Sequence, residues 1–511
     1  MRWWSVVAVA VMVAQVVEGA RILMLAPLSV PSHNIFFMSI AEVLAARNHS
    51  VTYVTGNKVS KPTTNIREVF VPNANVYDIF SKRSLFNITW RSLTTEILPL
   101  IPISCVDALT SKEMRSIQDE EFDLVFMSFS GADCFYPYIN KLQVPYIHMS
   151  PNVLVGSYSD MASNPYFLSL MPNILLGLKF PLTFFGRMVN IFVDMLSLAI
   201  NLYYICPRME EECRKRHVLP DNMPSFAEMR TNGSLLIINS VKTMERPTVP
   251  YVPAVIHAGG IHCRPARPLP QELEDWVAGA GEAGFIFFSL GSLVKPTSLP
   301  EKHQTTLLQV FASLEQRVLW KWNEDTMDNL PANVRLSKWL PQQDILGDPR
   351  LRLFITHGGL LSTLEATYHG APLLGLPVVI DQQHNMQRVL EEGWGRVLKW
   401  DNLTYHNLRQ NILEIIHDTS IRETVVRRSA MMRDQPMTPG QWLSYWVEYV
   451  LRHRGAYHLR CPAHKMPWYQ LYNVDVWLLV VVVVALVSFL TFKLVFTVCT
   501  YLCSARKHKQ D

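Results

Sequence analysis

Short apolar runs alternate with longer amphipathic segments from residue 21 onward. Residues 21–26 (RILMLA) form a strand-like run, a helix-like pattern occupies residues 34–47, and a second strand-like run fills residues 50–55. Strand, helix and strand at this spacing predict a βαβ unit with a parallel sheet. Asn48 stands where the helix has to end, and asparagine tolerates the left-handed conformation common at such ends. Further strands are predicted at residues 123–127 and 144–149.

The same alternation restarts in the second half of the chain, after the proline-rich residues 245–270. A helix is expected near residues 301–314, and another runs from Gly358-Gly359 to His369, where Gly370 closes it. Strands are predicted at residues 284–290, 318–322, 334–338 and 353–356. Two such halves predict an α/β protein of two Rossmann-like domains that face each other across a ligand-binding cleft.

Both ends of the chain carry apolar segments of a different kind. Residues 1–20 combine a basic start, a short apolar stretch and small residues at the end, which is typical of a secretory signal peptide. The run from Val474 to Leu502 is long enough for a membrane-spanning helix, which needs about 20 apolar residues. Arg506, Lys507 and Lys509 follow, and this basic excess predicts a cytosolic tail and a lumenal body.

The predicted organisation therefore has seven parts. These are a signal peptide (1–20), a first Rossmann-like domain (21–244), a linker (245–270), a second Rossmann-like domain (271–438), return helices with a juxtamembrane segment (439–473), a transmembrane helix (474–499) and a cytosolic basic tail (500–511). With 49% hydrophobic residues and a net charge of only +4, the 511-residue chain lacks the basic excess of a nucleic-acid binder.

The predicted location gives meaning to several short motifs. The last five residues, KHKQD, resemble the Lys-x-Lys-x-x retrieval signal of endoplasmic reticulum membrane proteins, although an ordinary basic stop-transfer tail is the alternative. Four Asn-x-Ser/Thr sequons are candidate glycosylation sites in the secretory pathway, at Asn48, Asn87, Asn232 and Asn402. The six cysteines of the predicted lumenal part include no Cys-x-x-Cys spacing. They leave room for one or two disulfides, whose pairing cannot be read from the sequence.

Residues 173–205 are apolar but are interrupted by Lys179, Pro181, Gly186, Arg187 and Asp194. These interruptions argue against a membrane span. Amphipathic helices that line a cleft or lie against the membrane fit the pattern, and plain core helices fit it equally well.

The strongest candidate chemistry lies between residues 339 and 382. The pair Gly358-Gly359 follows a strand and opens a helix, so that backbone N–H groups and the positive end of the helix can hold an anion such as a diphosphate. A Gly-Gly turn by itself is weak evidence, but this one is part of a longer spaced pattern. The pattern consists of WLPQ at residues 339–342, FITHGG at residues 354–359, and then Ser362, Glu365, Pro372, Pro377, Asp381 and Gln382.

This pattern resembles the donor-site signature of the UDP-glycosyltransferase family. The likeness extends over essentially the whole chain and is greatest to the membrane-bound animal enzymes, in particular the insect type, whose Gly-Gly-Leu-Leu-Ser-Thr it shares at residues 358–363. It implies a GT-B-like fold in which the first domain binds the acceptor and the second binds the UDP-sugar. It also implies a hexosyltransferase active in detoxification.

The resemblance assigns the nucleoside and diphosphate contacts. Trp339 would stack on uracil, Gln342 would hydrogen-bond the nucleoside, and Glu365 would accept both ribose hydroxyls. Donors to the diphosphate would be Ser292, His357, Ser362 and the backbone N–H of Gly359. Many members of the family carry asparagine where this chain has Leu361, which cannot donate to phosphate. Asp381 and Gln382 would hold the sugar hydroxyls.

The general base is expected from the first domain. His33 follows the first strand at the start of a helix, whose positive end disfavours the imidazolium ion. A neutral histidine suits the role of base toward an acceptor hydroxyl, and His33 occupies the family's catalytic position. The family holds this histidine with an acidic residue, but Ser128 stands where that acid is often found. Asp133, five residues later, is the nearest candidate for the orienting role.

The implied reaction is a direct displacement at the anomeric carbon, with inversion. Among the predicted lumenal residues no Asp-x-Asp motif or metal-ligand spacing occurs, so we expect no metal and no cofactor besides the UDP-sugar substrate. Expected partners are a small lipophilic acceptor and the membrane, with a homo-oligomer left open. Alternatives are a UDP-sugar-binding protein with impaired catalysis and a transferase acting on membrane lipids.

The donor is expected to be UDP-glucose rather than UDP-glucuronic acid. A carboxylate at C6 needs a nearby cation, because burying an unpaired charge is costly. The sugar end of the pattern, residues 378–385, reads VVIDQQHN and contains no fixed cation. Glucuronosyl enzymes share the Asp-Gln pair, however, so a cation from elsewhere, such as Arg264 or Arg267, is the alternative.

Overall fold

The computed structural model describes residues 19–57, 63–71, 86, 90–292, 294, 298–324 and 326–507. Residues 1–18 of the predicted signal peptide, the sequon Asn87 and the last four residues of the predicted tail lie outside this part. The chain divides into two compact units, Met1–Arg460 and Cys461–Asp511, which are described separately.

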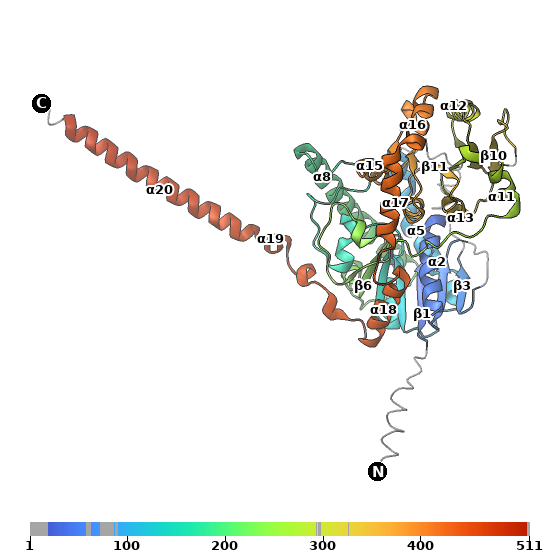
Figure 1. Cartoon of the computed structure of the whole chain (residues 1–511). Helices are drawn as coiled ribbons and strands as arrows, with labels where there is room; N and C mark the ends of the chain where they lie inside the picture. Colours follow the sequence, from blue (N-terminus) through green and yellow to red (C-terminus); the bar gives the residue numbers. More distant parts are fainter. Residues whose placement is uncertain are drawn as a thin grey trace, which may run out of the picture. The chain divides into compact units, whose positions relative to one another are not determined.

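The first domain is built on a parallel sheet of seven strands in the order β3-β2-β1-β4-β5-β6-β7. The outward growth from β1 in both directions is that of a doubly wound fold. In Figure 1 the labelled strands β1, β3 and β6 of this sheet lie together, near the labels of α2 and α18. The strands are β1 (Arg21–Ala26), β2 (Ser50–Thr55), β3 (Ile66–Phe70), β4 (Leu124–Ser128), β5 (Tyr146–Ser150), β6 (Leu235–Ile238) and β7 (Val255–His257).

The central strands are buried on both faces, which explains their continuous apolar sequences. One face is covered by α2 (Pro31–Ala45) and α18 (Pro439–Arg452). The other is covered mainly by α5 (Leu100–Leu109), α9 (Cys206–Lys215) and α10 (Phe226–Thr231). The helix after β1 begins three residues earlier than the sequence pattern predicts, because Pro31 occupies its first turn, where proline needs no hydrogen bond. Asn48 has a φ of 66°, as expected for the end of that helix.

The second domain has a parallel sheet of six strands in the order β10-β9-β8-β11-β12-β13. Its strands are β8 (Phe285–Ser289), β9 (Arg317–Lys321), β10 (Val334–Ser337), β11 (Leu351–Thr356), β12 (Leu373–Gly375) and β13 (Gly395–Val397). Its helices include α11 (Gln271–Ala278), α12 (Glu301–Ala312), α13 (Gln342–Leu346), α14 (Leu360–His369), α15 (Gln382–Glu391), α16 (Tyr405–His417) and α17 (Thr419–Arg433). Four of these strands match the predicted positions within two residues, whereas the three-residue strands β12 and β13 carry too short a signal to predict.

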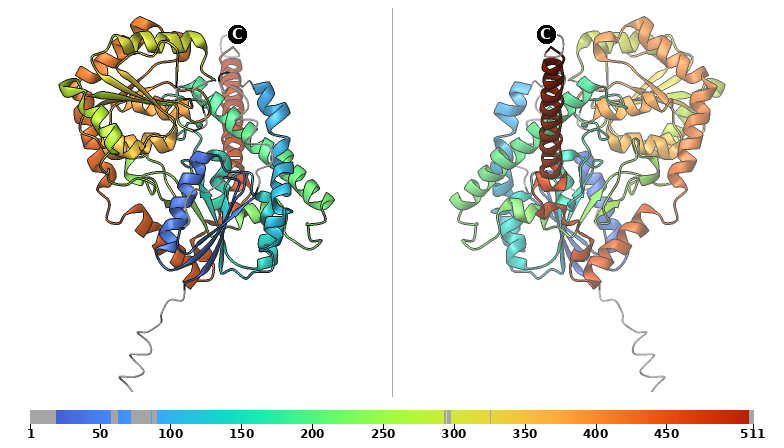
Figure 2. Two further views of the ribbon diagram at one scale, coloured as in Figure 1. Left: turned by 90° about the vertical axis from the view of Figure 1, so that its right-hand side faces the viewer. Right: turned by 90° about the vertical axis from the view of Figure 1, so that its left-hand side faces the viewer.

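The segment predicted as a linker, residues 245–270, contains the last strand of the first sheet. β7 pairs with β6 through Val255, Ile256 and His257. Proline-rich flanks concealed this three-residue strand from the sequence pattern, so the first domain extends beyond residue 244. The chain also returns to the first domain through α18, whose Leu443, Val447 and Val450 are buried in its core. Figure 2 shows α18 beside the first sheet, close to α2.

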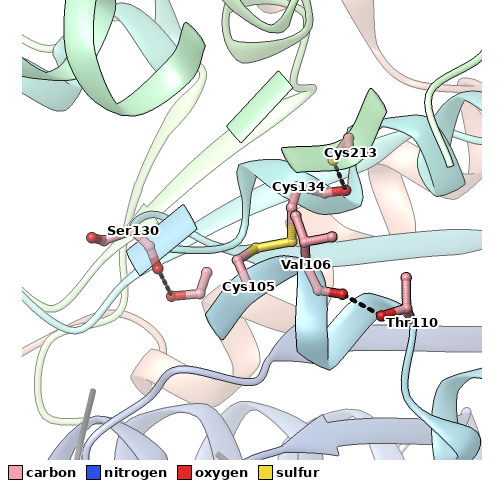
Figure 3. The surroundings of a disulfide bond; sticks show 7 residues. Cys105, Val106, Thr110, Ser130, Cys134 and Cys213 are labelled. Carbon is pink, nitrogen blue, oxygen red and sulfur yellow. Dashed lines mark hydrogen bonds between the residues drawn. A yellow bond between two sulfur atoms is a disulfide. The ribbon is translucent and has the colours of Figure 1, made fainter. Parts of the chain in front are cut away.

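One disulfide joins α5 to the turn η3 (Asp133–Phe135), through Cys105 and Cys134 (Figure 3). This pairing could not be read from the sequence. The thiol of Cys213 on α9 lies beside the bridge and donates to the carbonyl oxygen of Cys134 at 3.8 Å. Burial raises the pKa of Cys213 to about 12, so the thiol remains protonated near neutral pH.

The interrupted apolar segment contains α8 (Phe184–Ile200), and this helix is not a plain core helix. Its buried residues are the polar Asn190 and Asp194. Its exposed residues include large apolar ones, namely Phe184, Phe185, Met188, Val189, Ile191, Phe192, Met195 and Leu196.

The second unit contains α19 (Trp468–Leu471) and the long α20 (Val474–Lys507). The stretch Val474–Leu502 has a mean hydropathy of 2.8 over its most apolar window, and none of that window is buried. By length and composition this helix can cross a membrane. It extends beyond the predicted end at residue 499 as one unbroken helix (Figure 1).

Candidate active site

The candidate residues gather at the carboxyl ends of the strands in both domains. His33 follows β1 in the first domain, and the Gly-Gly turn follows β11 in the second. The two domains touch at the start of α14, where Leu361 packs against the apolar core of the first domain. This core also includes Phe129, a neighbour of His33. Leu361, the departure from the family's usual asparagine, therefore serves as an apolar contact between the domains.

His33 lies in the first turn of α2 and is half-buried. Its ring centroid is 6.5 Å from that of Phe129. Burial lowers the pKa of His33 to about 4, so the imidazole is neutral at physiological pH. Within the described residues no hydrogen bond holds the ring.

The residue next to it, Asn34, fixes the start of α2 to the end of β2. The hydroxyl of Tyr53 donates to Asn34 Oδ1 at 2.5 Å, and that of Thr55 donates to the same atom at 3.1 Å. The amide of Asn57 donates to the carbonyl oxygen of Ser29 at 2.6 Å. These contacts position the turn that carries His33. Asn34 was not among the predicted site residues. Its position directly after His33 was the feature of the sequence that could have indicated a role in placing the histidine.

Asp133 is buried in η3, and its neighbours are not those predicted. It faces Arg230 and Tyr136, and burial raises the pKa of its carboxyl. Arg230 in turn donates to Asp160 Oδ2 at 2.8 Å. No hydrogen bond between Asp133 and His33 is found in the described part of the chain. The orienting role of Asp133 therefore stays a prediction, which these contacts do not support.

The Gly-Gly turn has the backbone geometry that its sequence suggested. Gly358 has a φ of 85°, and a Cβ atom there would come within 2.5 Å of Met386 Cγ. Gly359 caps α14, a helix of ten residues. The backbone N–H of Gly358 donates to Thr356 Oγ1 at 3.3 Å. An anion at this turn would therefore be received by the N–H of Gly359 and the positive end of α14.

His357 is wedged between two glycine backbones. A Cβ atom at Gly291 would lie 2.5 Å from its Cε1, and one at Gly359 would lie 2.7 Å from its Nε2. Burial, together with the positive charge of Lys321, lowers the pKa of His357 to about 4. A neutral imidazole so placed can donate one N–H bond to an oxygen of the diphosphate. Ser292, next to Gly291, is exposed to solvent.

The predicted nucleoside contact Gln342, the predicted diphosphate donor Ser362 and the predicted ribose contact Glu365 form a small network. The amide of Gln342 donates to Ser362 Oγ at 3.0 Å and to Glu365 Oε2. Burial raises the pKa of the Glu365 carboxyl to about 7, even though Gln342 and the nearby Arg264 and Lys321 lower it. Glu365 is thus a carboxyl group that changes its protonation state near neutral pH.

Lys321, at the end of β9, was not predicted as a site residue. Its ammonium lies 5.6 Å from the centre of the Trp339 ring and donates to the carbonyl oxygen of Gly291 at 3.2 Å. Trp339 itself is 78% exposed, which leaves an indole face free for stacking. Lys321 also interacts electrostatically with Glu365 and His357. The sequence feature that could have indicated a role for Lys321 is the placement of a cation between two tryptophans, Trp320 and Trp322.

The sugar end of the pattern is an ordered loop followed by α15. The side-chain oxygen of Gln382 accepts from the backbone N–H groups of Val378 and Val379 at 2.7 and 3.0 Å. Asn385 donates to Asp381 Oδ2 at 2.8 Å, and burial raises the pKa of Asp381. Ile380 has a φ of 61°, a strained conformation for a β-branched residue of the kind that collects at functional sites.

Arg264 and Arg267, the alternative partners for a donor carboxylate, both form hydrogen bonds with Asp344. The guanidinium of Arg264 binds Asp344 through two hydrogen bonds, at 2.6 and 2.9 Å. The backbone N–H of Arg267 also donates to Asp344. Arg264 is therefore already paired. Within the described residues no group of three or more His, Cys, Asp or Glu side chains is arranged to hold a metal ion.

Comparison with known proteins gives a consistent result. The family model described as "UDP-glucoronosyl and UDP-glucosyl transferase" matches residues 20–509. The UDP-glucosyltransferase 2 of Dactylopius coccus is 33% identical over 96% of this chain and 94% of its own length. The UDP-glucuronosyltransferase 2B16 of Oryctolagus cuniculus is 31% identical over 87% of this chain and 88% of its own.

A solved structure of a UDP-glucose: anthocyanidin 3-O-glucosyltransferase in complex with UDP has a TM-score of 0.58 and 14% identity, covering 85% of this chain and all of that one. At this identity the likeness bears on the fold, and it confirms the predicted GT-B architecture of two Rossmann-like domains. The chain belongs to the UDP-glucuronosyl and UDP-glucosyl transferase family, and it is a UDP-glycosyltransferase.

Proposed function

We propose that this enzyme transfers a hexose, glucose in our assignment, from its UDP-sugar to a hydroxyl group of a small lipophilic acceptor, with inversion. The observation that carries the proposal is the presence of both parts in one chain. The first domain has a neutral His33, and the second has the Gln342–Glu365 network and the Gly-Gly turn. One domain thus offers a base, and the other offers a site for a nucleoside diphosphate.

The mechanism follows from these two parts. His33 removes the proton of the acceptor hydroxyl as its oxygen attacks the anomeric carbon from the side opposite UDP. The bond to the diphosphate breaks, and the charge that develops on UDP is stabilised by the backbone N–H of Gly359, by the positive end of α14 and by His357. An α-linked sugar therefore becomes β-linked. Because preorganised dipoles meet the leaving group, we propose that no metal is required.

The donor assignment rests on charge. Asp381 offers a hydrogen-bond acceptor to neutral hydroxyls but would repel a carboxylate at C6. Arg264 is already paired with Asp344, which weakens the case for a glucuronate partner there. One of the relatives described above is named a glucosyltransferase and another a glucuronosyltransferase, so the comparisons leave the choice between the two donors to experiment.

A donor panel tests this assignment. Microsomes containing the full chain would be incubated with a phenolic acceptor and equal concentrations of UDP-glucose, UDP-glucuronic acid and UDP-galactose. We expect the fastest product formation from UDP-glucose, and faster transfer from UDP-glucuronic acid would overturn the assignment. The same assay in EDTA tests metal independence, since loss of activity that added metal restores would refute it.

The location we propose is the endoplasmic reticulum membrane, with a single span through α20, a lumenal catalytic body and a cytosolic basic tail. The apolar α20 supports the span. The sequons Asn48, Asn232 and Asn402 are all exposed and so accessible to glycosylation. Sensitivity of the protein to endoglycosidase H, together with protection of the body from protease in sealed microsomes, is the expected result.

A second candidate is a lumenal UDP-sugar-binding protein with impaired catalysis. The observation that favours it is the placement of Asp133 against Arg230 and Tyr136 rather than against His33. Such a protein would bind UDP without turning over any donor. A transferase that acts on membrane lipids remains the third candidate, and replacing the phenol by a ceramide or sterol acceptor in the donor panel distinguishes it.

A further inference from the structure

The helix α8 has its polarity reversed relative to a normal surface helix. Asn190 and Asp194, one turn apart, face the protein. The opposite stripe carries Phe185, Met188, Phe192 and Met195, and the two phenylalanines are 75% and 67% exposed. A surface helix of a globular protein normally presents its apolar stripe to the core. Contiguous exposed apolar surface of this kind marks an interaction site.

The buried polar side of α8 is well satisfied, so the orientation of the helix is fixed. Asn190 accepts from the backbone N–H of Asn173 at 2.7 Å and donates to the carbonyl oxygens of Leu168 and Met171. Asp194 accepts from the amide of Asn173 at 2.9 Å. Rotating the helix to bury its phenylalanines would break these bonds. The apolar stripe therefore faces outward because the hydrogen bonds of Asn190 and Asp194 hold the polar face against the protein.

The stretch of sequence that contains α8 is poor in acidic residues. Between residues 161 and 209 the sequence contains a single acidic residue, Asp194, which is buried. The same stretch carries three cations, Lys179, Arg187 and Arg208. Apolar side chains with basic residues beside them in the sequence are typical of helices that lie in the membrane interface. The exposed Glu391 of α15, which accepts from the backbone N–H of Phe180 at 3.2 Å, is an acid found beside this stretch.

The chain itself carries a proposed membrane anchor. The proposed span α20 begins at Val474, and residues 461–473 connect it to the catalytic body. Even fully extended, these residues reach at most about 45 Å. A short tether of this kind keeps the catalytic body within reach of the bilayer that α20 would span, which makes a lipid surface a more available partner than a second protein.

We propose that α8 is an interfacial membrane helix, inserted into the leaflet next to the catalytic body, where it brings the acceptor side of the enzyme against the bilayer. The proposal rests on the membrane anchorage proposed above. Behind α8 lies η4 (Gly156–Ala162), which carries Tyr158. Tyr158 packs edge-on against Phe129 at 4.7 Å between ring centroids, and Phe129 neighbours His33.

This succession of contacts connects the membrane face to the candidate base through a few layers of side chains. Lipophilic acceptors concentrate in the bilayer, so an entry beside α8 would shorten their path to His33. The acceptors expected to benefit are those that partition strongly into lipid. Water-soluble phenols would gain nothing from the contact.

Photo-crosslinking tests the insertion directly on the full chain. The protein would be reconstituted in phosphatidylcholine nanodiscs that contain a lipid with a diazirine in its acyl chain, irradiated and mapped by mass spectrometry. We expect lipid adducts on residues 184–196 and on α20. The matched control surface is α17, where Val426 is 60% exposed, and it should carry none.

A variant pair gives the proposal a second test. Phe185→Glu with Phe192→Glu should remove the adducts on α8 by at least tenfold and leave those on α20, whereas Val426→Glu should change neither. The absence of adducts on α8 in the wild type, or their persistence in the double variant, would overturn the proposal. Lipid-independent crosslinks between α8 helices of two copies would overturn it in favour of a protein interface.

The adducts are measured without donor or acceptor, so this result is independent of whether the proposed transferase reaction is correct. Kinetics then examine the consequence. The double variant should raise the KM of a strongly lipid-partitioning phenol at least fivefold and change that of a water-soluble phenol less than twofold. Equal changes for both phenols would refute the entry route.

Discussion

The two domains share a parallel α/β architecture but present their functional residues very differently. In the second domain Gln342, Ser362 and Glu365 contact one another, and His357 is held between two glycine backbones. In the first domain His33 lies beside Phe129 and has no hydrogen-bond partner among the described residues. The polar groups proposed to bind the donor are thus already bonded to one another. In contrast, no hydrogen bond among the described residues restrains the proposed base.

This difference suggests how the two sides recognise their ligands. A fixed polar network suits one invariant group, the nucleoside diphosphate, because preorganised groups lose little entropy on binding. An apolar environment around the base suits varied lipophilic acceptors, which need few directed contacts. Substitutions on the two sides should therefore change different kinetic constants.

The largest effect is expected at the base. His33→Ala should lower kcat by about 10²–10⁴-fold, the usual contribution of general base catalysis. The affinity for UDP, measured by calorimetry, should change less than about twofold, because His33 belongs to the other domain. Loss of UDP binding in this variant would contradict the division of labour, and an unchanged kcat would remove His33 from the mechanism.

The next effect is expected at the ribose contact. Glu365→Gln should weaken UDP binding by about 10- to 100-fold, since hydrogen bonds to a charged group contribute about 1.5–3 kcal/mol. Titration calorimetry at pH 8 measures it. The kcat of this variant at saturating donor should remain close to that of the wild type, because His33 is unchanged. A change smaller than threefold in the affinity for UDP would show that Glu365 does not hold the ribose.

The pH dependence separates the same two residues. The pKa of Glu365 is about 7, and in the proposed role the ionised carboxylate accepts the ribose hydroxyls. Affinity for UDP should therefore strengthen as pH rises to 7 and weaken by about tenfold for each pH unit below it. The pKa of His33 is about 4, so kcat should hold its value down to about pH 5. An acid limb near pH 7 in kcat, rather than in the affinity for UDP, would reverse the assignment.

A smaller effect is expected at the stacking residue. Trp339→Ala should weaken binding of UDP by about tenfold, because stacking of a base on an aromatic side chain contributes about 1–3 kcal/mol. Trp339→Phe should recover most of this affinity. Equal losses in the alanine and phenylalanine variants would indicate that the indole does not stack on uracil.

The smallest catalytic effect is expected at Asp133. Its observed neighbours are Arg230 and Tyr136, so Asp133→Asn should change kcat less than about threefold while lowering the melting temperature. A stability measurement by thermal unfolding accompanies the kinetics. A hundredfold fall in kcat with an unchanged melting temperature would instead restore the predicted pair of His33 and Asp133.

The sequence predicted most where local patterns decide the structure. Buried central strands such as β1 and β8 can be recognised in the sequence as apolar runs. The spacing of Gln342, Ser362 and Glu365 correctly indicated residues that lie close together in the fold. Short strands escaped prediction because three residues such as those of β7 carry little periodicity. The start of α2 also differs from the predicted residue 34, because Pro31 occupies the first turn of this helix.

The features that could not be predicted depend on contacts between distant segments. Asp133 meets Arg230, which comes from a helix almost a hundred residues later, so its partner is set by the packing of α10. Lys321 approaches Trp339 from a neighbouring strand, outside the spaced pattern. The outward stripe of α8 follows from the bonds of Asn190 to Asn173 and its neighbours, and the sequence left that helix open between core, cleft and membrane.

The central claim is that the first domain activates an acceptor for inverting transfer from a donor held by the second. It is tested most directly by NMR spectroscopy of the full-length enzyme in microsomes turning over UDP-glucose with a phenolic acceptor. The account predicts that the α-anomeric signal of the donor falls as a β-glucoside signal rises in equal amount from the first time point. With His33→Ala, neither change should occur at a comparable rate, although UDP still binds. An α-linked product, or UDP binding without any glycoside from the wild-type enzyme, would contradict the account.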